Sequence, residues 1–374
     1  MDARMERLEQ WRHGGVAGPV RIEAELTDRC NLPCVFCWRY NQEFARALKA
    51  RRDRGEDELP ADDWLRLVVE SAALGALEWH ICGGGEPLVR GGLARKLFTA
   101  VKDAGMEGLL TTNGTLIDDE TAGILVDSGW DMVEISIESP GPKPNDELRG
   151  AGSHAAAMNA MARLNAWKRR LGSRTPRLQL AAVLCNRNHL LLPDLLRFTH
   201  AVGAEKLSVN PIVTPPGAPD AARRLRLSTL QLTELTTAIQ EAIAIAGELG
   251  LDTNVADFLS TQYVSKTDHF DQLFTTGDRE PSVDPFRHAH CFVPWNTIAI
   301  RPDGRAGPCV AYRYGEGEDV RRRNLADIWT GEYFQSVRRQ ILARRPPEYC
   351  SRCCAPFIID GETTRRALAG GGES

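Results

Sequence analysis

The stretch that decides the fold of this chain is residues 26–38, Leu-Thr-Asp-Arg-Cys-Asn-Leu-Pro-Cys-Val-Phe-Cys-Trp. It places Cys30, Cys34 and Cys37 in one short run with a C-x3-C-x2-C spacing. Three thiolates can hold three corners of an iron–sulfur cube, and the fourth iron then stays open to bind a substrate or a cofactor. A structural zinc site is the alternative, but it normally closes four ligands in two C-x2-4-C pairs, and this run has three cysteines and no histidine.

The run follows an apolar, β-prone stretch at residues 21–27 and resembles the signature of radical S-adenosylmethionine (radical SAM) enzymes, in which an aromatic residue, here Phe36, precedes the third cysteine. The resemblance implies that the amino and carboxylate groups of the methionine portion of SAM chelate the open iron. One electron from the reduced cube then cleaves the sulfonium, and the resulting 5′-deoxyadenosyl radical removes a hydrogen atom from the substrate. Because such a radical must be shielded from water and held against one carbon, a closed barrel is favoured.

Composition restricts the class of protein. The chain has 374 residues, of which 43% are hydrophobic and 26% are charged, as in an ordinary globular protein. Its formal charge of −4 gives no polybasic surface for nucleic acid or anionic lipid. No apolar run reaches the ~18 residues of a membrane span, and no signal peptide is evident, so we expect a cytoplasmic protein that binds neither membrane nor nucleic acid. Eight of its ten cysteines occur in metal-type clusters and not as an export disulfide framework.

Strand-like and helix-like segments alternate between residues 20 and 212, which is the pattern of βα units around a parallel sheet. Six strands are predicted, at residues 22–27, 77–82, 107–112, 131–137, 177–184 and 206–211. The intervening helices are predicted at residues 61–74, 92–104, 118–127, 153–171 and 189–202. Six repeats fit the α/β fold that the resemblance implies, a partial (β/α)6 TIM-like barrel, in which chemistry gathers at the carboxyl ends of the strands.

The chain is predicted to divide into five segments. They are an N-terminal extension at 1–19, the barrel core at 20–212, a linker and helical bridge at 213–284, a small α+β cluster-binding module at 285–361, and a tail at 362–374. Pro and Gly crowd residues 213–226, and a long helix is predicted at 228–249. The first twenty residues are too few for a separate peptide-recognition domain.

A glycine-rich run follows the second predicted strand, with Gly83, Gly84, Gly85 and Glu86 after Cys82. It is similar to the GGEP motif of the radical SAM family. Glycines let the backbone approach a ligand because no Cβ stands in the way. The resemblance implies that this edge and Glu86 bind the amino group of the methionine portion of SAM; a plain tight turn is the alternative.

Polar residues at other strand ends are further candidates for cofactor binding. By the same resemblance, Thr112, Asn113 and Ser136 contact the ribose and methionine groups of SAM. Asn210 is a candidate at the end of the sixth strand. Arg149 resembles the arginine of an Asp-x-x-Arg segment in this family, where a guanidinium fork suits the methionine carboxylate; a surface ion pair is the alternative. Cys82 and Cys185, without cysteine neighbours in sequence, are predicted to be core residues.

A second set of cysteines lies in the C-terminal module. Cys291 and Cys309 are joined by a C-x12-G-x4-C spacing. A turn signal at residues 302–304 predicts a hairpin of strands 296–301 and 305–310, which would bring the two cysteines close together.

One helix predicted at 325–342 then returns the chain to Cys350 and Cys353. The pattern resembles the SPASM/twitch extension of radical SAM enzymes, and four thiolates would close every corner of one auxiliary [4Fe–4S] cluster. Cys354 is an alternative to Cys353 as a ligand. A four-cysteine zinc site is the alternative to the cluster.

A fully ligated auxiliary cluster has no open iron, so we expect it to carry electrons. The leading hypothesis is oxidation (dehydrogenation) of a small sugar or aminocyclitol-like natural-product intermediate, as in the twitch-bearing aminocyclitol dehydrogenase that the module resembles. Candidate proton acceptors at the barrel mouth are Glu138, Arg149 and the pair His288 and His290, although structural roles are commoner for the two histidines. An electron donor such as flavodoxin or ferredoxin is expected.

Two other hypotheses remain. The first is maturation of a ribosomally synthesised peptide, by a thioether or carbon–carbon crosslink or by epimerisation, as many SPASM proteins perform; the absence of an N-terminal peptide-recognition domain counts modestly against it. The second is a non-catalytic, zinc-stabilised scaffold, which a brown, iron-containing protein would exclude.

Overall fold

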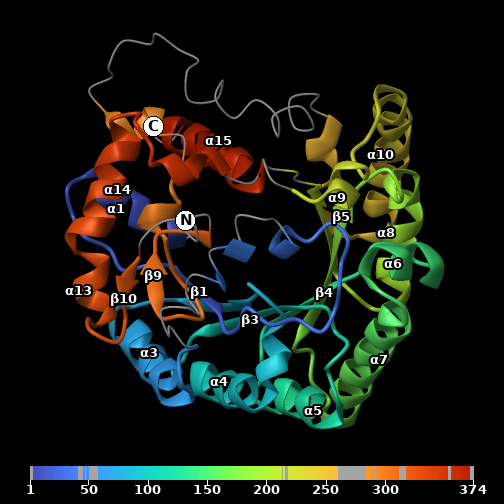
Figure 1. The fold of residues 1–374 in the computed structure, drawn as a ribbon, viewed down its shortest axis with the longest axis horizontal. Helices are drawn as coiled ribbons and strands as arrows, with labels where there is room; N and C mark the ends of the chain where they lie inside the picture. The colour runs from blue at the N-terminus through green and yellow to red at the C-terminus, as the bar shows by residue number, and fades with distance from the viewer. Residues whose placement is uncertain are drawn as a thin grey trace.

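The chain folds into a strongly curved sheet with helices on its outer face, as Figure 1 shows in the computed structural model. The structure describes residues 3–40, 45–46, 48–49, 58–212, 214, 218–259, 284–289, 291–310, 317–352 and 355–370. In these residues the sheet has ten strands in the order β10-β9-β8-β1-β2-β3-β4-β5-β6-β7. None of the described helices is both long and apolar enough to cross a bilayer.

Six consecutive parallel strands form the core of the sheet and confirm the predicted barrel pattern. They are β1 (Arg21–Glu25), β2 (Glu78–Cys82), β3 (Glu107–Thr112), β4 (Met132–Ser136), β5 (Arg177–Leu184) and β6 (Lys206–Pro211). The apolar residues of the first strands, such as Ile22 and Ile81, are fully buried, whereas the alternate residues Glu23 and His80 border a cavity inside the barrel. Side chains alternate between the two faces of a strand, so the apolar set packs outward under the helices.

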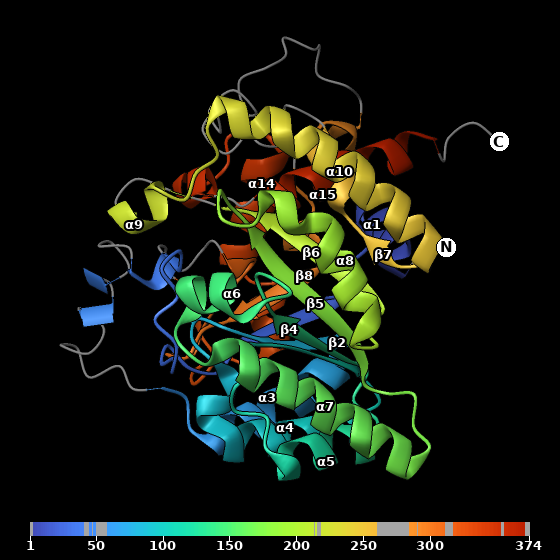
Figure 2. The same cartoon turned by 90° about the vertical axis from the view of Figure 1, so that its right-hand side faces the viewer.

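Helices cover the outer face of the sheet, and large aromatic side chains take part in their packing. They are α3 (Ala61–Ala73), α4 (Gly91–Asp103), α5 (Asp119–Asp127), α6 (Pro142–Arg149), α7 (Ser153–Leu171), α8 (Leu192–Ala201) and α10 (Thr229–Leu249). Trp64 of α3 meets Trp79 of β2 edge to face, with ring centroids 6.4 Å apart. Figure 2 shows α8 and α10 side by side over the β5–β6 side of the sheet. The predicted linker segment contains α9 (Asp220–Arg223), α10, β7 (Asp252–Thr253) and η4 (Val255–Leu259) among its described residues.

The C-terminal module continues the sheet of the barrel. β8 (Thr297–Ile300) pairs parallel with β1, and β9 (Arg305–Gly307) returns antiparallel along β8 through the predicted turn, where Gly304 has a φ of +79°. β10 (Glu318–Asp319) adds to the edge of β9. The module therefore shares one sheet with the barrel.

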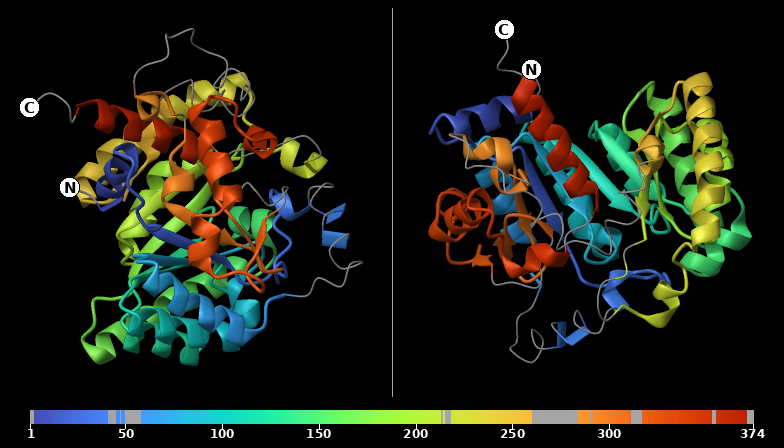
Figure 3. Two further views of the ribbon diagram at one scale, coloured as in Figure 1. Left: turned by 90° about the vertical axis from the view of Figure 1, so that its left-hand side faces the viewer. Right: turned by 90° about the horizontal axis from the view of Figure 1, so that it is seen from above.

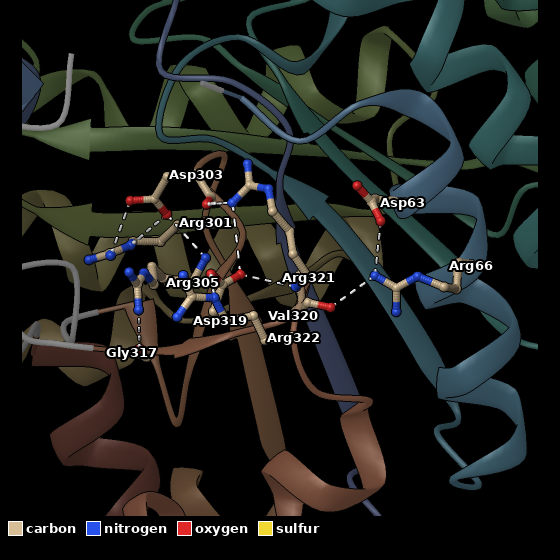
Figure 4. Close-up of polar contacts among 10 residues, drawn as sticks. All are labelled: Asp63, Arg66, Arg301, Asp303, Arg305, Gly317, Asp319, Val320, Arg321 and Arg322. Carbon is tan, nitrogen blue, oxygen red and sulfur yellow. Dashed lines mark hydrogen bonds and ion pairs between the residues drawn. The ribbon is translucent and has the colours of Figure 1, made fainter. Parts of the chain in front are cut away.

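Arginine side chains secure this hairpin to the barrel (Figure 4). Arg66 of α3 donates to the carbonyl of Val320 at 2.9 Å and is paired with Asp63 at 3.0 Å. Within the hairpin, Arg301 donates through Nε and Nη2 to the two carboxylate oxygens of Asp303, at 3.2 and 3.1 Å. These contacts fix the hairpin relative to α3.

The prediction of a single helix at residues 325–342 is wrong, because the structure has two helices there. α13 (Leu325–Trp329) and α14 (Glu332–Leu342) are separated by Thr330 and Gly331. Gly331 is the extended N-cap of α14, and a Cβ at this position would lie 2.6 Å from the carbonyl oxygen of Asp327. The glycine permits the close approach that turns the chain between the helices.

Two terminal helices lie against each other across the open side of the barrel. α15 (Ala355–Gly370) lies in the gap between the two sides of the curved sheet, as the right-hand view of Figure 3 shows. Arg4 of α1 (Ala3–Arg12) donates to Asp360 of α15 at 2.6 Å, and Leu8 and Leu368 share one apolar cluster. α15 runs through residue 361, where the sequence analysis places the boundary between the module and a tail.

Candidate cluster and cofactor site

The cysteine run lies directly after β1, at the carboxyl end of the strand, where barrels of this kind place their chemistry. The glycine-rich run after β2 holds it by two backbone hydrogen bonds. Gly85 N–H donates to the carbonyl of Thr27 at 2.7 Å, and Glu86 N–H donates to the carbonyl of Arg29 at 2.8 Å. A Cβ on Gly85 would lie 1.9 Å from the Arg29 carbonyl oxygen. Glycine is therefore required here so that the two backbones can meet.

The three thiols form one electrostatic group. Cys34 is buried, and Cys30 and Cys37 are partly buried. Burial raises the pKa of Cys34 to about 11, opposed by the Arg149 guanidinium and reinforced by Cys37 and Cys30. Burial likewise raises the pKa of Cys37. A set of buried, mutually repelling thiolates fits a cationic metal centre, because metal binding replaces the thiol protons.

In the described ranges, no three His, Cys, Asp or Glu side chains converge as ligands of one metal ion.

Glu86 is a buried carboxylate whose oxygens bind protein donors. Oε1 accepts from Thr112 Oγ1 at 2.7 Å and from Leu88 N–H at 3.1 Å, and Oε2 accepts from Asn113 N–H at 2.8 Å. Burial raises the pKa of Glu86, and these hydrogen bonds oppose the rise. The predicted SAM-binding residues Glu86, Thr112 and Asn113 are therefore together, with Glu86 fastening the glycine-rich run to the end of β3.

Asn31, which the sequence analysis did not single out, joins the cysteine loop to the same strand end. Its Oδ1 accepts from Asn113 Nδ2 at 3.0 Å, and its Nδ2 donates to Thr115 Oγ1 at 2.8 Å. Asn113 Oδ1 in turn accepts from the N–H of Thr115 at 2.9 Å. The position of Asn31 between Cys30 and Cys34 is the only sequence signal that could have indicated this role.

Arg149 links the cysteine loop to a buried carboxylate. Its Nε and Nη2 contact Oε1 of Glu138 at 2.8 and 2.5 Å, and its Nη1 lies 3.9 Å from Sγ of Cys34. Its Cζ lies 5.5 Å from the ring centroid of Phe36. Oε2 of Glu138 accepts from Val183 N–H at 2.7 Å. Both carboxylate oxygens of Glu138 therefore have protein partners. Arg149 and Glu138 form a buried ion pair, whereas the alternative considered from the sequence was an ion pair on the surface.

Helix α6 brings Arg149 to this position. Val35 N–H donates to the carbonyl of Leu148 at 2.9 Å, and the Sγ of Cys34 lies 3.8 Å from the carbonyl oxygen of Arg149. Leu148 and Cys185 form a small apolar cluster with Val35 and Phe36 packed against it. Cys185 is thus a core residue as predicted, whereas Cys82 is only partly buried.

A row of polar side chains crosses the inner face of the barrel. Nε2 of His80 lies 2.8 Å from Oγ1 of Thr111, which donates to Oε1 of Glu134 at 3.1 Å. Gln179 bonds to Glu134 and donates to Oγ of Ser208 at 2.8 Å. Burial raises the pKa of Glu134, and burial together with the nearby Arg21 cation lowers the pKa of His80 to about 3.

This row borders a cavity of about 670 Å³ inside the barrel. Its wall includes Arg21, Glu23 and Lys206, and the Arg4–Asp360 pair lies at its margin. Asn210, predicted as a cofactor contact, lines this cavity. Ser136, at the end of β4, is partly buried and does not border the cavity.

The C-terminal module gathers its described cysteines. The thiols of Cys291 and Cys350 are close enough that Cys291 adds to the effect of burial, which raises the pKa of Cys350 to about 12. Cys309 and Cys350 pack against the same buried pair, Ala299 and Tyr349. Cys353, Cys354 and His290 lie outside the described residues, and His288 ends the short helix η5 (Pro285–His288).

Two family models match this chain. The model of the radical SAM superfamily matches residues 24–168, and that of an iron–sulfur cluster-binding domain, SPASM, matches residues 291–354. The first range holds the cysteine loop and the glycine-rich run, and the second holds all the cysteines of the C-terminal module. Both groups of cysteines therefore fall within the matched ranges.

The chain is also similar to curated proteins over almost its whole length. A PqqA peptide cyclase of Rhodopseudomonas palustris is 27% identical over 365 residues, which cover 95% of this chain and 85% of that protein. A PqqA peptide cyclase of Granulibacter bethesdensis is 28% identical over 359 residues, covering 92% and 85%.

Solved structures share the fold at low sequence identity. Streptococcus suis SuiB superposes with a TM-score of 0.64 at 19% identity, over 89% of this chain and 70% of that chain. The structure of anSMEcpe with bound AdoMet superposes with a TM-score of 0.57 at 14% identity, over 94% and 98%. The two family models and the curated relatives, with the cysteine loop at the end of β1, show that this chain belongs to the radical SAM superfamily and is a radical SAM enzyme with a C-terminal SPASM domain.

Proposed function

We propose that this enzyme modifies a ribosomally synthesised peptide. The observation that carries the proposal is the alignment of the PqqA peptide cyclases along 95% of the chain, through both the barrel and the cluster module. Structures that share the fold include SuiB bound to precursor peptide SuiA and anSMEcpe bound to AdoMet and a peptide. These relatives favour the peptide hypothesis over oxidation of a sugar or an aminocyclitol, which the sequence analysis places first.

In this proposal Cys30, Cys34 and Cys37 hold three corners of a [4Fe–4S] cluster. When bound, the cluster and SAM supply a radical oxidant that removes a hydrogen atom from the substrate. Arg149 places a cation beside Cys34, which offsets part of the negative charge of the three thiolates. Glu86 and Asn113 hold the adjoining strand ends against the loop, and Val35 and Phe36 of the loop pack against the apolar cluster that contains Leu148 of α6.

The C-terminal cysteines are proposed to hold one auxiliary [4Fe–4S] cluster. Cys291, Cys309 and Cys350 would supply three ligands, and Cys353 or Cys354 the fourth. A closed cluster would accept the electron that remains when a substrate radical forms a crosslink and loses a proton. An external donor such as flavodoxin or ferredoxin would reduce the first cluster.

The interior of the barrel offers room for part of a peptide. Its cavity of about 670 Å³ falls in the range of ordinary ligand sites. The wall presents cations, carboxylates and amides, including Arg21, Glu23 and Asn210, which suits polar side chains and peptide groups. Glu134 lines this cavity and Glu138 does not, so Glu134 is the better placed of the two carboxylates for accepting a substrate proton.

The proposal is tested by anaerobic turnover. Reconstituted, reduced enzyme is incubated with SAM and either short peptides encoded beside its gene or a panel of aminocyclitols and sugars. We expect 5′-deoxyadenosine together with a peptide that has lost two hydrogen atoms, or a peptide of unchanged mass with an inverted residue. The variant Cys34→Ala is the control and should give neither product. Conversion of an aminocyclitol or sugar, with every peptide unchanged, would contradict the proposal.

A further inference from the structure

One part of the barrel is rich in basic residues and lacks acidic ones. Residues 148–193 contain eight arginines and lysines and no aspartate or glutamate, a local excess that the net charge of −4 conceals. Four of these arginines lie between the last turn of α7 and the first residue of β5, and all four are exposed. They are Arg169, Arg170, Arg174 and Arg177, which we call the arginine corner.

The positive charge of the arginine corner is not neutralised within the part of the chain that the structure describes. None of its four arginines forms an ion pair with a described residue, whereas the equally exposed Arg197 pairs with two carboxylates. Arg169 and Arg170 are favoured by the negative end of the helix dipole of α7. Arg174 and Arg177 lie beyond the helix and gain nothing from it. The four like charges repel one another, and an anionic ligand would relieve that repulsion.

Hydrogen bonds hold the backbone of the arginine corner in one conformation. Gly172 ends α7, and Ser173 N–H donates to the carbonyl of Lys168 at 2.9 Å. Thr175 N–H donates to Oγ of Ser173 at 3.1 Å, and Nζ of Lys168 donates to the carbonyl of Pro176 at 3.2 Å. A ligand that binds here therefore pays only for ordering the arginine side chains and not for ordering the loop.

The arginine corner adjoins the cavity inside the barrel. Arg177 and Gln179 are two residues apart on β5, so their side chains leave the same face of the strand. Gln179 donates to Ser208 on that face and is paired in register with Lys206, which lines the cavity. Arg177 and Lys206 are the first residues of their strands, so the corner and this part of the cavity both lie at the amino ends of the strands. Figure 2 shows the end of α7 on the same side of the molecule as α1, whose Arg4 also lines the cavity.

We propose that the arginine corner binds an acidic segment of the peptide substrate, while the residue to be modified enters the cavity. Guanidinium groups pair with carboxylates through two parallel hydrogen bonds, and one extended peptide can contact both places because they adjoin at one end of the barrel. Since the four arginines are exposed, each contact is weak and is screened by salt. Together the contacts steer and orient the peptide more than they tighten its binding. The identity of the occupant rests on the proposed function.

The first test measures binding and needs no turnover. Fluorescence anisotropy follows a labelled peptide of alternating Ser and Glu, with the Ser and Lys peptide as its counterpart of opposite charge. At low ionic strength the wild-type enzyme should bind the acidic peptide at least about tenfold more tightly than the double variant Arg170→Glu, Arg174→Glu does, and added salt should reduce this difference. The double variant Arg322→Glu, Arg339→Glu is the matched control, because it makes the same change of charge at exposed arginines of the C-terminal module. It should bind the acidic peptide as wild type does.

Two results of this binding test would overturn the inference. One is equal affinity of wild type and of the variant Arg170→Glu, Arg174→Glu for the acidic peptide. The other is tighter binding of oligothymidylate, or of vesicles that contain phosphatidylserine, than of the acidic peptide, which would assign the arginine corner to nucleic acid or to a membrane.

The second test measures turnover of the peptide encoded beside the gene. The variant Arg170→Glu, Arg174→Glu should have a raised KM and an unchanged kcat, because the corner contacts the peptide away from the reacting residue. The control variant should keep both constants. An unchanged KM, or conversion of a peptide that has no acidic residue outside the modified ones, would overturn the inference. If no peptide reacted, the proposed function would be contradicted, and the binding test would still decide whether the corner takes an acidic segment.

Discussion

Arg149 binds Glu138 in the interior of the protein, with Nε of Arg149 2.8 Å from Oε1 of Glu138, and the same guanidinium reaches within 3.9 Å of the sulfur of Cys34. The glutamate side chain is fully buried, and that of the arginine is 10% exposed. One cation therefore compensates both a buried carboxylate and a cysteine of the proposed cluster loop. This ion pair joins the end of β4, the end of α6 and the cysteine run.

Removal of the arginine should destabilise the fold. Arg149→Met leaves Glu138 buried without its cation, and breaking a buried pair in this way costs about 3–5 kcal/mol. We expect a fall of that size in the free energy of unfolding of the cluster-free protein, measured by urea denaturation.

Two further variants serve as controls. Arg197 forms exposed ion pairs with Asp194 and Glu241, so Arg197→Met should leave the free energy of unfolding almost unchanged. The double variant Glu138→Gln, Arg149→Met should recover part of the lost stability, since no uncompensated carboxylate remains. An Arg149→Met protein as stable as wild type would show that the pair is not the anchor described above.

The glycine-rich run should tolerate no side chain at its third glycine. In Gly85→Ala the new Cβ would collide with the backbone carbonyl of Arg29, so the loop must move away from the cysteine run. We expect a loss of SAM affinity of at least about tenfold, equivalent to about 1.4 kcal/mol, measured by equilibrium binding to the reconstituted enzyme.

Gly92→Ala is the matched control for this prediction. Gly92 lies in α4, and a Cβ there would meet nothing within 4 Å. Alanine is the better helix former, so this variant should bind SAM normally and gain up to about 1 kcal/mol of stability. Normal SAM affinity in Gly85→Ala would contradict the close approach seen at this glycine.

Glu134 should make the stability of the protein depend on pH in a defined direction. Burial raises its pKa, so the fold favours the protonated carboxyl. The stability that the protonated Glu134 carboxyl contributes is therefore fully present below the pKa of about 4.3 in the unfolded chain. It is lost as the pH rises through the raised pKa of the folded protein. Glu134→Gln mimics the protonated form at every pH, so the melting temperature of this variant minus that of wild type should increase with pH. A difference that is constant or decreases with pH would show that Glu134 is not held in this way.

Much of the barrel could be predicted from local sequence. β3, β5 and β6 begin and end at the predicted residues, because each is a short β-prone segment next to turn residues. α7 also matches its predicted range, with Gly172 ending it in the left-handed conformation at a φ of +63°. Of the strands that pair with each other, β1 and β8 are the most widely separated in sequence, and their pairing could not be predicted because nothing local specifies their contact.

Fewer features of the site than of the barrel could be predicted from the sequence. α6 was not predicted, because Pro142, Lys143 and Pro144 at its start resemble a loop and its apolar face is short. Without that helix the ion pair of Arg149 with Glu138, and its approach to Cys34, could not be foreseen. The polar lining of the barrel was visible as alternate polar residues in the strands, but the link from His80 through Thr111 to Glu134 depends on strand register.

The most direct test of the account is the metal content and SAM cleavage of the enzyme and of a variant with Cys30, Cys34 and Cys37 all changed to alanine. Anaerobically reconstituted wild-type protein should hold about eight iron atoms per chain, as expected for two [4Fe–4S] clusters, and should form 5′-deoxyadenosine when reduced with SAM. The variant should keep about half of the iron and form none. Zinc in the wild-type loop, or continued SAM cleavage by the variant, would contradict the assignment of these three cysteines.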